Sequence, residues 1–529
     1  MKTMILSLAA LLSASVVMAQ ANASNVSQEG EDNVANISQV GSFNSSMTIQ
    51  AGGGNNAEAI QGDAFDSRSG IVEQTQTGDK NSAFAKHEED ENQVYQVQVG
   101  NGNSASATQN LAFFGGDNFT LQTQEGDGND AVSSQEGLGN TAFQEQLGDG
   151  NSATSTQEGV DNFSDSYQEG AFNTATIAQV GSTNISQQTQ FGEANIANAE
   201  QWGTNNFVIQ DQQGGGNLAT SIQGSVAFDS RGGEVQQVQI GDENEAFANH
   251  EEDDNTILQG QIGDANSASA EQNLGSFGGD NFSIQIQSGN GNVAEVSQNG
   301  SNNSADQLQI GDENVVTAVQ NGTNNVSDQD QNGVGNLAQV TQDGSDNTNI
   351  QDQSGSGNVA TSIQGSFLFD SRGGTVDQFQ SGERNNAFAQ HEEDNNVVTQ
   401  TQLGNGNSAS VTQNLLFFGG DNFTQQFQIG DGNIAEASQE GDFGINGENN
   451  ITSHIQLGDE NIAMTSQNGA GNISDIFQSG NGNIAEDTQF GTDNFTFVTQ
   501  TGDAHSSIIL QVGSNNSSVV TQTNGAGGF

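Results

Sequence analysis

The chain has 529 residues, a formal net charge of −59, 69 glycines, and neither proline nor cysteine. Its seven Lys and Arg residues are too few to neutralise phosphates, which excludes a nucleic-acid partner, and without cysteine there are no disulfides or thiolate metal sites. An apolar share of 31% is too small for several ordinary globular cores. Disordered chains of this polarity are usually rich in proline, whereas paired strands exclude it.

Residues 1–21 are predicted to be a secretory signal peptide. Lys2 supplies a positive charge, an apolar run extends from Met4 to Met18, and small residues surround a cleavage point between positions 19 and 23. The run is shorter than a membrane span, and no later segment is apolar enough to form one. We therefore expect a protein that is secreted, extracellular or held at the cell surface, with no membrane span.

From residue 22 to residue 529 the chain repeats an eleven-residue tile. Counting its first Asn as place zero, the tile has Ala or Ser at place two, Gln at place six and Gly at place eight, and it occurs 43 times between Asn22 and Gln522. The seven residues from Asn to Gln make one strand, and Gly permits the positive φ of the following turn. Stacked amides should form hydrogen-bonded ladders. The clearest ladder residues are Asn129, Gln135, Asn140, Gln146, Asn151, Gln157, Asn162, Gln168, Asn173 and Gln179.

A second alternation doubles the period. Place four is Gln in alternate tiles, as at Gln122 and Gln144, and is small or apolar in the tiles between, as at Ala107 and Ser155. One coil therefore consists of two tiles and contains two strands. Place four of one strand should face place two of the opposite strand, so that a large Gln meets Ala or Ser. The sequence predicts an all-β, amyloid-like, two-sheet β-solenoid of 22-residue coils.

Three modules, residues 61–124, 223–287 and 364–428, decorate this repeat. Each contains FDSR, then HEED, then FGGDN, and each of these segments follows an even-numbered tile. Because the FDSR and FGGDN insertions leave the glutamine alternation intact, we expect turn bulges rather than extra strands. The three turns of one module should stack on one edge over three successive coils. The phenylalanines of the bulges cover the sheet edge or form lateral contacts between fibres.

The acidic HEED turns allow two interpretations. In one, His is a ladder-compatible replacement for the tile Gln, and the arginines Arg68, Arg231 and Arg372 pair with the acidic turn one coil away. In the other, the turns bind a divalent cation, Ca²⁺ being the best match to oxygen ligands, and cations bridge the edge to a docking or lateral partner. The candidate ligands are Glu88, Glu89, Asp90, Glu251, Glu252, Asp253, Glu392, Glu393 and Asp394. No other cofactor is expected.

The tile resembles the curlin repeat, whose strands follow Ser-x5-Gln-x-Gly-x-Gly-Asn-x-Ala-x3-Gln. The segment from Gln124 to Gln135 carries the Q-x-G-x-G-N-x-A core with the last Gln one place later, and the segments that begin at Gln146 and Gln428 match as closely. The resemblance covers nearly the whole of residues 22–529. It implies a secreted, curli-like subunit of cross-β fibres in a biofilm matrix, with secretion and nucleation partners at the outer membrane. The decorated modules have no counterpart in that repeat.

These observations favour a structural subunit of an extracellular amyloid fibre that self-assembles by strand stacking and serves a biofilm matrix or surface adhesion. The alternative is a monomeric secreted or cell-surface solenoid adhesin, which would depend on cations if the acidic turns bind them. An enzyme is not expected, because the acidic turns are repeated without a groove beside them and basic residues are nearly absent.

Overall fold

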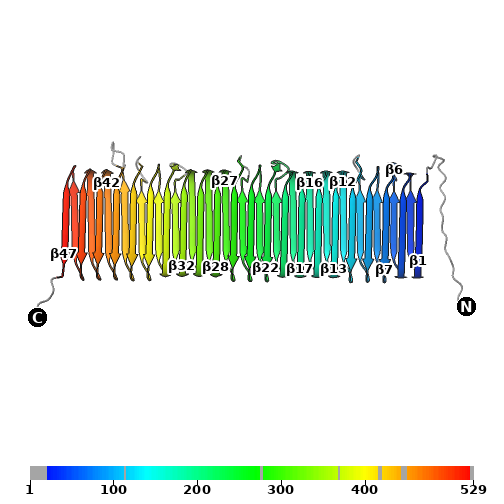
Figure 1. Ribbon diagram of the computed structural model, residues 1–529, viewed down its shortest axis with the longest axis horizontal. Coiled ribbons are helices and arrows are strands. Elements are labelled where there is room, and N and C mark those ends of the chain that lie inside the picture. Colours follow the sequence, from blue (N-terminus) through cyan, green and yellow to red (C-terminus); the bar gives the residue numbers. More distant parts are fainter. Residues whose placement is uncertain are drawn as a thin grey trace. The chain divides into compact units, whose positions relative to one another are not determined.

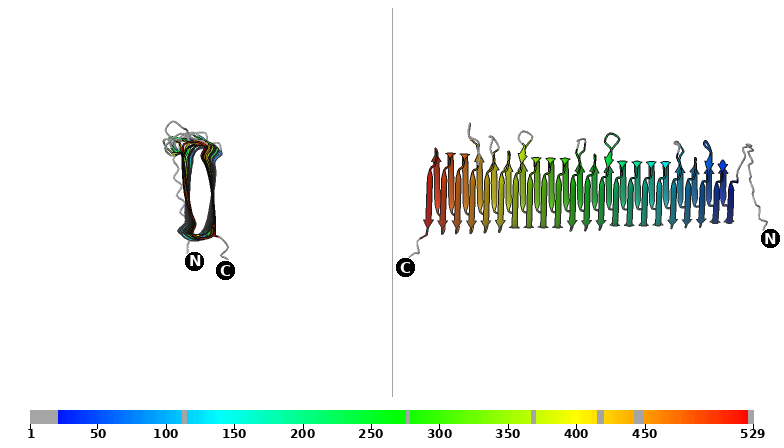
Figure 2. Two further views of the ribbon diagram at one scale, coloured as in Figure 1. Left: turned by 90° about the vertical axis from the view of Figure 1, so that its left-hand side faces the viewer. Right: turned by 45° about the horizontal axis from the view of Figure 1, so that its top comes forward.

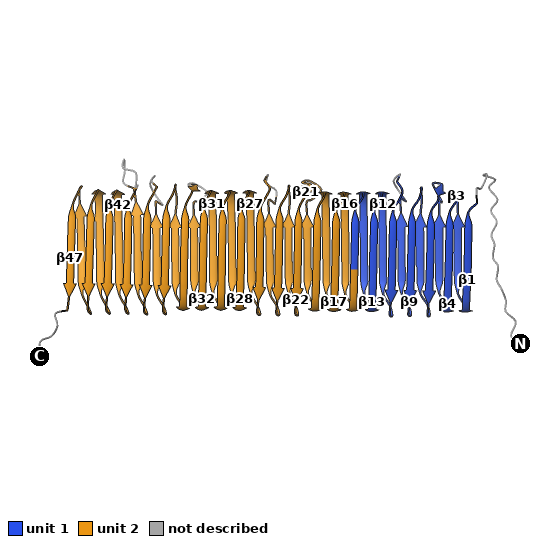
Figure 3. Cartoon of the chain, viewed as in Figure 1, with its two compact units in different colours: residues 1–166 blue, residues 167–529 orange. Residues whose placement is uncertain are grey.

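The computed structural model describes residues 21–111, 115–274, 278–366, 370–414, 420–441 and 449–524. The regular elements of these residues are β-strands, and none of them forms a helix able to cross a membrane. The chain divides into two compact units, residues 1–166 and 167–529 (Figure 3). The predicted signal peptide lies almost entirely outside the described residues.

In unit 1 the strands alternate along the chain between two parallel sheets (Figure 1). Odd-numbered tiles form sheet A, which holds β1 (Ala23–Glu31), β4 (Ser45–Gly53), β7 (Ile71–Thr77), β9 (Gln93–Val99), β11 (Phe119–Glu125) and β13 (Thr141–Asp149). Even-numbered tiles form sheet B, which holds β2 (Val34–Gln39), β5 (Asn56–Gln61), β8 (Ser82–His87), β10 (Ser104–Gln109), β12 (Asp130–Leu138) and β14 (Ser152–Val160). Two short strands, β3 (Gly41–Ser42) and β6 (Ser67–Arg68), pair at a turn.

Unit 2 repeats the arrangement, and β15 (Phe163–Ala171) runs across the boundary between the units. Its sheet A holds β17 (Ile185–Glu193), β19 (Phe207–Gly215), β22 (Glu234–Ile240), β24 (Thr256–Ile262), β26 (Phe282–Ser288), β28 (Ser304–Asp312), β30 (Val326–Val334), β32 (Thr348–Ser356), β35 (Thr375–Glu383), β37 (Val397–Leu403), β39 (Phe423–Ile429), β41 (Ile451–Leu457), β43 (Ile473–Ser479), β45 (Phe495–Thr501) and β47 (Ser517–Thr523).

Sheet B of unit 2 holds β16 (Thr174–Ser182), β18 (Ile196–Thr204), β20 (Leu218–Gln223), β23 (Glu245–His250), β25 (Ser267–Gln272), β27 (Val293–Ser301), β29 (Val315–Thr323), β31 (Leu337–Ser345), β33 (Val359–Gln364), β36 (Asn386–His391), β38 (Ser408–Gln413), β40 (Ile434–Glu440), β42 (Ile462–Ala470), β44 (Ile484–Thr492) and β46 (Ser506–Val512). Two short strands, β21 (Ser230–Arg231) and β34 (Ser371–Arg372), pair with the ends of β18 and β31.

The register confirms the predicted two-tile coil. In undecorated regions each strand pairs with the strand two tiles later, as Gln307 does with Gln329, so that identical places stack. Across a decorated turn the step along the sequence becomes longer and the places still match, as at Gln96 with Gln122 and Gln210 with Gln237. The predicted all-β, two-sheet solenoid is therefore what each unit forms.

Many strands continue beyond the tile Gln, whereas the sequence predicted that they end there. The reason is the turn glycine, which still pairs with the glycine of the next coil, as Gly137 does with Gly159. Gly126 has φ of +117°, and a Cβ on it would lie 2.1 Å from the carbonyl oxygen of Gly148. Stacked turns of this kind require glycine for its positive φ and for the close approach of the next backbone.

The interior follows the predicted match of large and small side chains. In unit 1, place two of sheet A (Val72, Val94) packs against place four of sheet B (Ala59, Ala85, Ala107) in one buried cluster. The Gln122 amide, at place four of sheet A, donates to the carbonyl oxygen of Ala131, at place two of sheet B, at 3.1 Å. Figure 2 shows how closely the two sheets face each other. The two sheets can lie this close together because one of the two facing side chains in each pair is small.

Candidate functional site: amide ladders and the decorated edge

The glutamines at place six form continuous ladders and also join the two sheets. Gln98 Nε2 donates to Gln124 Oε1 at 2.9 Å and to the Ser82 carbonyl of sheet B at 2.9 Å. Gln124 continues the ladder to Gln146 at 2.9 Å. In sheet B of unit 1, Gln135 donates to Gln157 at 2.8 Å. In unit 2, Gln168 and Gln179 donate to the glutamines one coil later, at 2.8 Å each.

The asparagines at place zero form the predicted amide ladder, as where Nδ2 of Asn162 donates to Asn140 Oδ1 at 3.1 Å, and they also bond to the backbone. The side-chain Oδ1 of Asn129 accepts the backbone N–H of Asn151 at 2.9 Å, and its Nδ2 donates to the carbonyl of Gly148, a turn glycine, at 2.7 Å. Asn140 likewise accepts from the backbone of Asn162, and Asn173 from that of Asn195. Each Asn therefore fixes the start of a strand to the turn of the next coil, which satisfies buried backbone groups.

In each module the three special turns follow neighbouring strands of sheet B. These strands are β5, β8 and β10 in the first module, β20, β23 and β25 in the second, and β33, β36 and β38 in the third. Within unit 2, Figure 2 shows the longer turns that are drawn in colour at one edge of the paired sheets. Within each module the predicted stacking over three successive coils is what the strand order shows.

The FDSR segment is more than a bulge, which corrects the prediction that it adds no strand. Its last two residues form the short strands β6, β21 and β34, and Ser67 takes the register of a turn glycine opposite Gly41. The residues before Ser67 loop out, and the chain then returns to the ladder. Among the phenylalanines of the bulges, Phe113, Phe114, Phe277, Phe369, Phe417 and Phe418 lie outside the described residues.

Beneath the edge, each module contains a buried His, Ser and Gly that replace tile residues. His87 is fully buried, its Nε2 lies 3.2 Å from Gln61 Nε2, and its Nδ1 lies 3.3 Å from Ser67 Oγ. Ser67 donates in turn to Asn44 Oδ1 at 3.0 Å. Gly70 occupies place zero of the next tile, and its missing side chain leaves room for the imidazole. The predicted ladder-compatible histidine is thus a buried corner residue.

The other two modules repeat this geometry. Nδ1 of His250 lies 3.4 Å from Ser230 Oγ, and Nδ1 of His391 lies 3.3 Å from Ser371 Oγ. Burial lowers the pKa of His87 and of His391 to about 4 and that of His250 to about 3, so all three imidazoles are neutral at pH 7.

The first carboxylate of the acidic turn holds the neighbouring bulge. Glu88 is 2% exposed, its Oε2 accepts the backbone N–H of Phe65 at 2.7 Å, and its Oε1 lies 3.4 Å from Lys86 Nζ. In the third module Glu392 bonds to Ser366, and burial raises its pKa. Glu251 is partly buried, and Glu89, Glu252 and Glu393 adopt positive φ values of 64–65°. Asp253 and Asp394 are exposed and Asp90 is partly so.

The arginines pair less uniformly than predicted. Arg68 lies 3.6 Å from Asp90 in the acidic turn one coil later, as expected. Arg372 instead lies 3.9 Å from Asp346 in the preceding coil. Arg231 is exposed and has no ion pair among the described residues. All these side chains are largely solvated, so the pairs contribute at most about 1 kcal/mol each.

No three His, Cys, Asp or Glu side chains of the described residues gather closely enough to hold a metal ion. The Ca²⁺ site suggested by the acidic turns therefore stays a prediction. The oxygens of Glu88 in particular already serve the Phe65 backbone and Lys86.

The sequence did not indicate a buried polar chain near the C-terminal end of unit 2. His454 Nε2 lies 2.8 Å from Thr465 Oγ1, which lies 2.9 Å from Ser474 Oγ, and Ser474 bonds to Asp487. Asp487 is 1% exposed, accepts from Thr496 at 3.1 Å, and its Oδ2 has no partner among the described residues. Burial raises the pKa of Asp487 to about 6 and lowers that of His454 to about 3.

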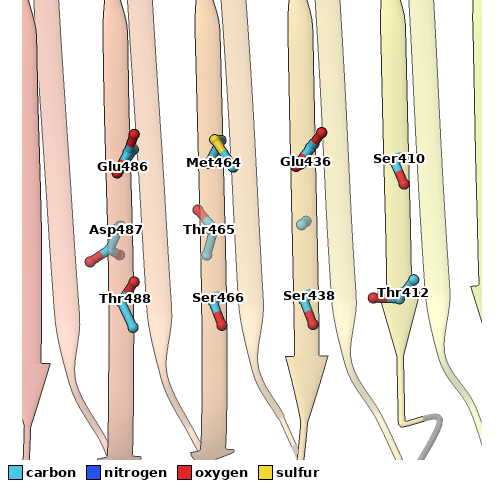
Figure 4. Close-up of a pocket in the computed structure, with 11 residues that line it drawn as sticks. Ser410, Thr412, Glu436, Ser438, Met464, Thr465, Ser466, Glu486, Asp487 and Thr488 are labelled. Carbon is cyan, nitrogen blue, oxygen red and sulfur yellow. The ribbon is translucent and has the colours of Figure 1, made fainter.

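A shallow depression of about 280 Å³ lies over the same strands on sheet B (Figure 4). It is lined by Glu436, Met464 and Glu486 at place three and by hydroxyl side chains at place five. In Figure 4 these side chains form rows across strands β38, β40, β42 and β44 and do not converge on one point. This arrangement indicates a patterned surface rather than a catalytic cleft.

Comparison with known proteins agrees with the repeat pattern. Among curated proteins, none matches the chain. Residues 491–523, which include β45, β46 and β47, match the family described as Curlin associated repeat, the family that the tile resembles.

Proposed function

We propose that this protein is the structural subunit of an extracellular, curli-like amyloid fibre that assembles by adding strands at the ends of the solenoid. The observation that carries the proposal is the exposure of the first and the last of the described strands. At the N-terminal end β1 is exposed along its whole length, and at the C-terminal end β47 alternates between exposed and half-buried residues. Uncapped parallel edges present unpaired N–H and C=O groups and bind further strands.

The contents of the coils support the same conclusion. In-register Asn and Gln ladders with a thin, dry interior are the side-chain arrangement of stable cross-β stacks. The family match lies at the C-terminal edge, in the segment that would contact the next subunit.

The proposal includes the setting that the curlin resemblance implies. The protein would be secreted through its N-terminal signal peptide, act outside the cell in a biofilm matrix or in surface adhesion, and depend on secretion and nucleation partners at the outer membrane. The decorated turns, which follow strands of sheet B, would be available for lateral contacts.

Fibre diffraction of the purified protein lacking residues 1–21 tests the proposal. A meridional reflection at about 4.7 Å, together with thioflavin binding that grows with time, is the expected result. A protein that stays monomeric at concentrations well above the micromolar range and gives neither signal would instead be the surface adhesin.

A further inference from the structure

We propose that successive copies join head to tail with their two sheets exchanged: β1 of one copy stacks on β46 of the preceding copy, and β2 stacks on β47. This inference rests on the proposed fibre function and adds the geometry of the junction. The first described strand, β1, and the last, β47, both lie in sheet A, because the 43 tiles between Asn22 and Gln522 are an odd number.

The alternation of strands between the two sheets determines where a strand that follows β47 would stack. In unit 2 each strand of sheet A is followed by a strand of sheet B, so the first vacant place after β47 lies on β46. If β1 of the next copy takes that place, β2 follows onto β47 without a gap. If β1 instead stacks on β47, the sheets stay the same, but β46 and the next β2 are two strand spacings apart, about 10 Å, and both lose a ladder partner.

The ladder groups left over at the two ends are complementary. Each place-six Gln uses one N–H for the facing strand and one for the Gln of the next coil. At the C-terminal end Gln511 donates to the Phe495 carbonyl and Gln522 to the Ser506 carbonyl, which leaves one N–H on each. At the N-terminal end Gln28 and Gln39 donate to later coils, which leaves their Oε1 atoms as acceptors.

Joining the ends with exchanged sheets extends both glutamine ladders, from Gln511 to Gln28 and from Gln522 to Gln39. It also lets Asn516 Oδ1 accept the backbone N–H of Asn33, just as Asn33 Oδ1 accepts that of Asn55 within unit 1. His505 stands in place of the tile Asn before β46, so the asparagine ladder supplies a single bond at the junction, the one between Asn516 and Asn33. Two N-terminal ends would place acceptors against acceptors, which makes the junction head to tail.

At both ends the interior lacks the place-four glutamine that distinguishes sheet A from sheet B. In the middle of the chain, place four is Gln in sheet A and small or apolar in sheet B. At the N-terminal end it is Val26 in β1 and Ile37 in β2. At the C-terminal end it is Ile509 in β46 and Val520 in β47, the latter half-buried against Val498 and its neighbours. Exchanged stacking places Ile509 on Val26 and Val520 on Ile37. Apolar side chains therefore stack on apolar side chains at place four, and no Gln is left there without another Gln to bond.

Charge favours the same pairing of ends. The strands β45, β46 and β47 contain no charged residue, whereas β1 carries Glu29 and Glu31. An acidic end meets an uncharged one, so the junction avoids the like-charge repulsion expected in a chain with 66 acidic residues. Because the decorated turns follow sheet B, the module at 364–428 and the module at 61–124 of the next copy would lie on opposite edges of the fibre.

Engineered cysteines test the junction, since the chain has none of its own. Outward-facing residues at place five are used, because stacked parallel strands about 4.8 Å apart suit a disulfide. Fibres are grown from equimolar mixtures of single variants, oxidised, dissolved without reductant, and assayed for covalent dimer. Leu510→Cys with Ser27→Cys and Thr521→Cys with Ser38→Cys report exchanged sheets. Thr521→Cys with Ser27→Cys reports retained sheets, and each variant alone is the background control.

Exchanged stacking predicts at least about tenfold more dimer in the first two mixtures than in the third. Dimer in the third mixture alone would overturn the exchange and leave the fibre function standing. Fibres that give the cross-β reflection but no dimer in any mixture would also overturn it. A wild-type protein that forms no fibres would remove the proposed function itself. Electron microscopy of wild-type fibres needs no variant: protruding turns should alternate between two edges from subunit to subunit, and protrusions on one edge alone would contradict the proposal.

Discussion

Gly70 and His87 are matched in size: a Cβ atom on Gly70 would lie 2.1 Å from His87 Cε1. The imidazole of His87, the last residue of β8, fills the space left by the missing side chain of Gly70, which directly precedes β7. The same relation joins Gly233 to His250, also at 2.1 Å. A larger residue at one tile position is thus accommodated by removing a side chain from another, which preserves packing density.

This match predicts coupled effects of substitution. Gly70→Ala should destabilise β7 and β8 by about 1–3 kcal/mol through overpacking, and His87→Ala by about 2–4 kcal/mol through the cavity it leaves. The triple change Ser67→Gly, Gly70→Asn, His87→Gln restores the ordinary tile and should recover stability to within about 1 kcal/mol. Hydrogen exchange in these strands measures the effect, because repeat proteins open locally. Additive losses in the triple variant would show that the residues are not coupled.

Burial of the module histidines predicts weakening in acid. Their pKa in the folded protein, about 4 for His87 and His391 and about 3 for His250, is below the unfolded value near 6.5. The stability they contribute is therefore complete above pH 6.5 and is lost as the pH falls toward the folded pKa. The loss is on the order of 3 kcal/mol for the modules of His87 and His391 and on the order of 5 kcal/mol for that of His250. Exchange rates of β8, β23 and β36 between pH 7 and pH 4 test this, with the undecorated strand β29 of the same sheet as the internal control.

The general fold was accessible from sequence because it depends on one local rule repeated many times. Asn at place zero, Gln at place six and Gly at place eight each define strand, ladder and turn wherever they occur. The packing of each module histidine into the space left by a glycine was not predicted, because it depends on two residues in different sheets. Its only sequence signal is that the spacing between glycine and histidine is the same from Gly70 to His87, from Gly233 to His250 and from Gly374 to His391.

The buried chain from His454 to Asp487 has no repeated signal at all. Each residue departs singly from the tile, and only the facing of the two sheets brings Thr465 and Ser474 between them. Arg372 was misplaced for a related reason. The exposed arginines are long and weakly held, so the nearest carboxylate, in the preceding or the following coil, decides the pair.

Asp487 predicts the opposite pH response in the C-terminal coils. Its pKa in the folded protein, about 6, is above the unfolded value near 3.8, because the carboxylate is buried. The stability it contributes is complete below pH 3.8 and is lost as the pH rises through 6, at a cost on the order of 3 kcal/mol at pH 7. Asp487→Asn should remove this cost and slow exchange in β44 and β46 at pH 7 but not at pH 4. Equal effects at both pH values would show that ionisation is not the cause.

The outer face of unit 2 should make assembly sensitive to salt and acid. Asp306 stacks on Asp328, and Asp330 stacks on Asp352, in adjacent strands of sheet A. Burial and these neighbouring carboxylates raise the pKa of Asp330 to about 6. Protonation or screening relieves the repulsion, although partial exposure limits the gain to below about 1 kcal/mol per carboxylate.

Fibre growth at pH 7 should therefore accelerate with ionic strength, and Asp330→Asn should reduce that dependence. The matched control is Asp211→Asn, because Asp211 is not stacked on another carboxylate. Acid stabilises the protein at the stacked aspartates of unit 2 and at Asp487. It destabilises the protein at the three buried module histidines. Because Asp330 and Asp487 gain protons near pH 6 and the module histidines lose their stabilising effect progressively below pH 6.5, growth should be fastest at a mildly acidic pH and fall again toward pH 4. A rate that rises monotonically to pH 4 would mean that the module histidines do not limit assembly.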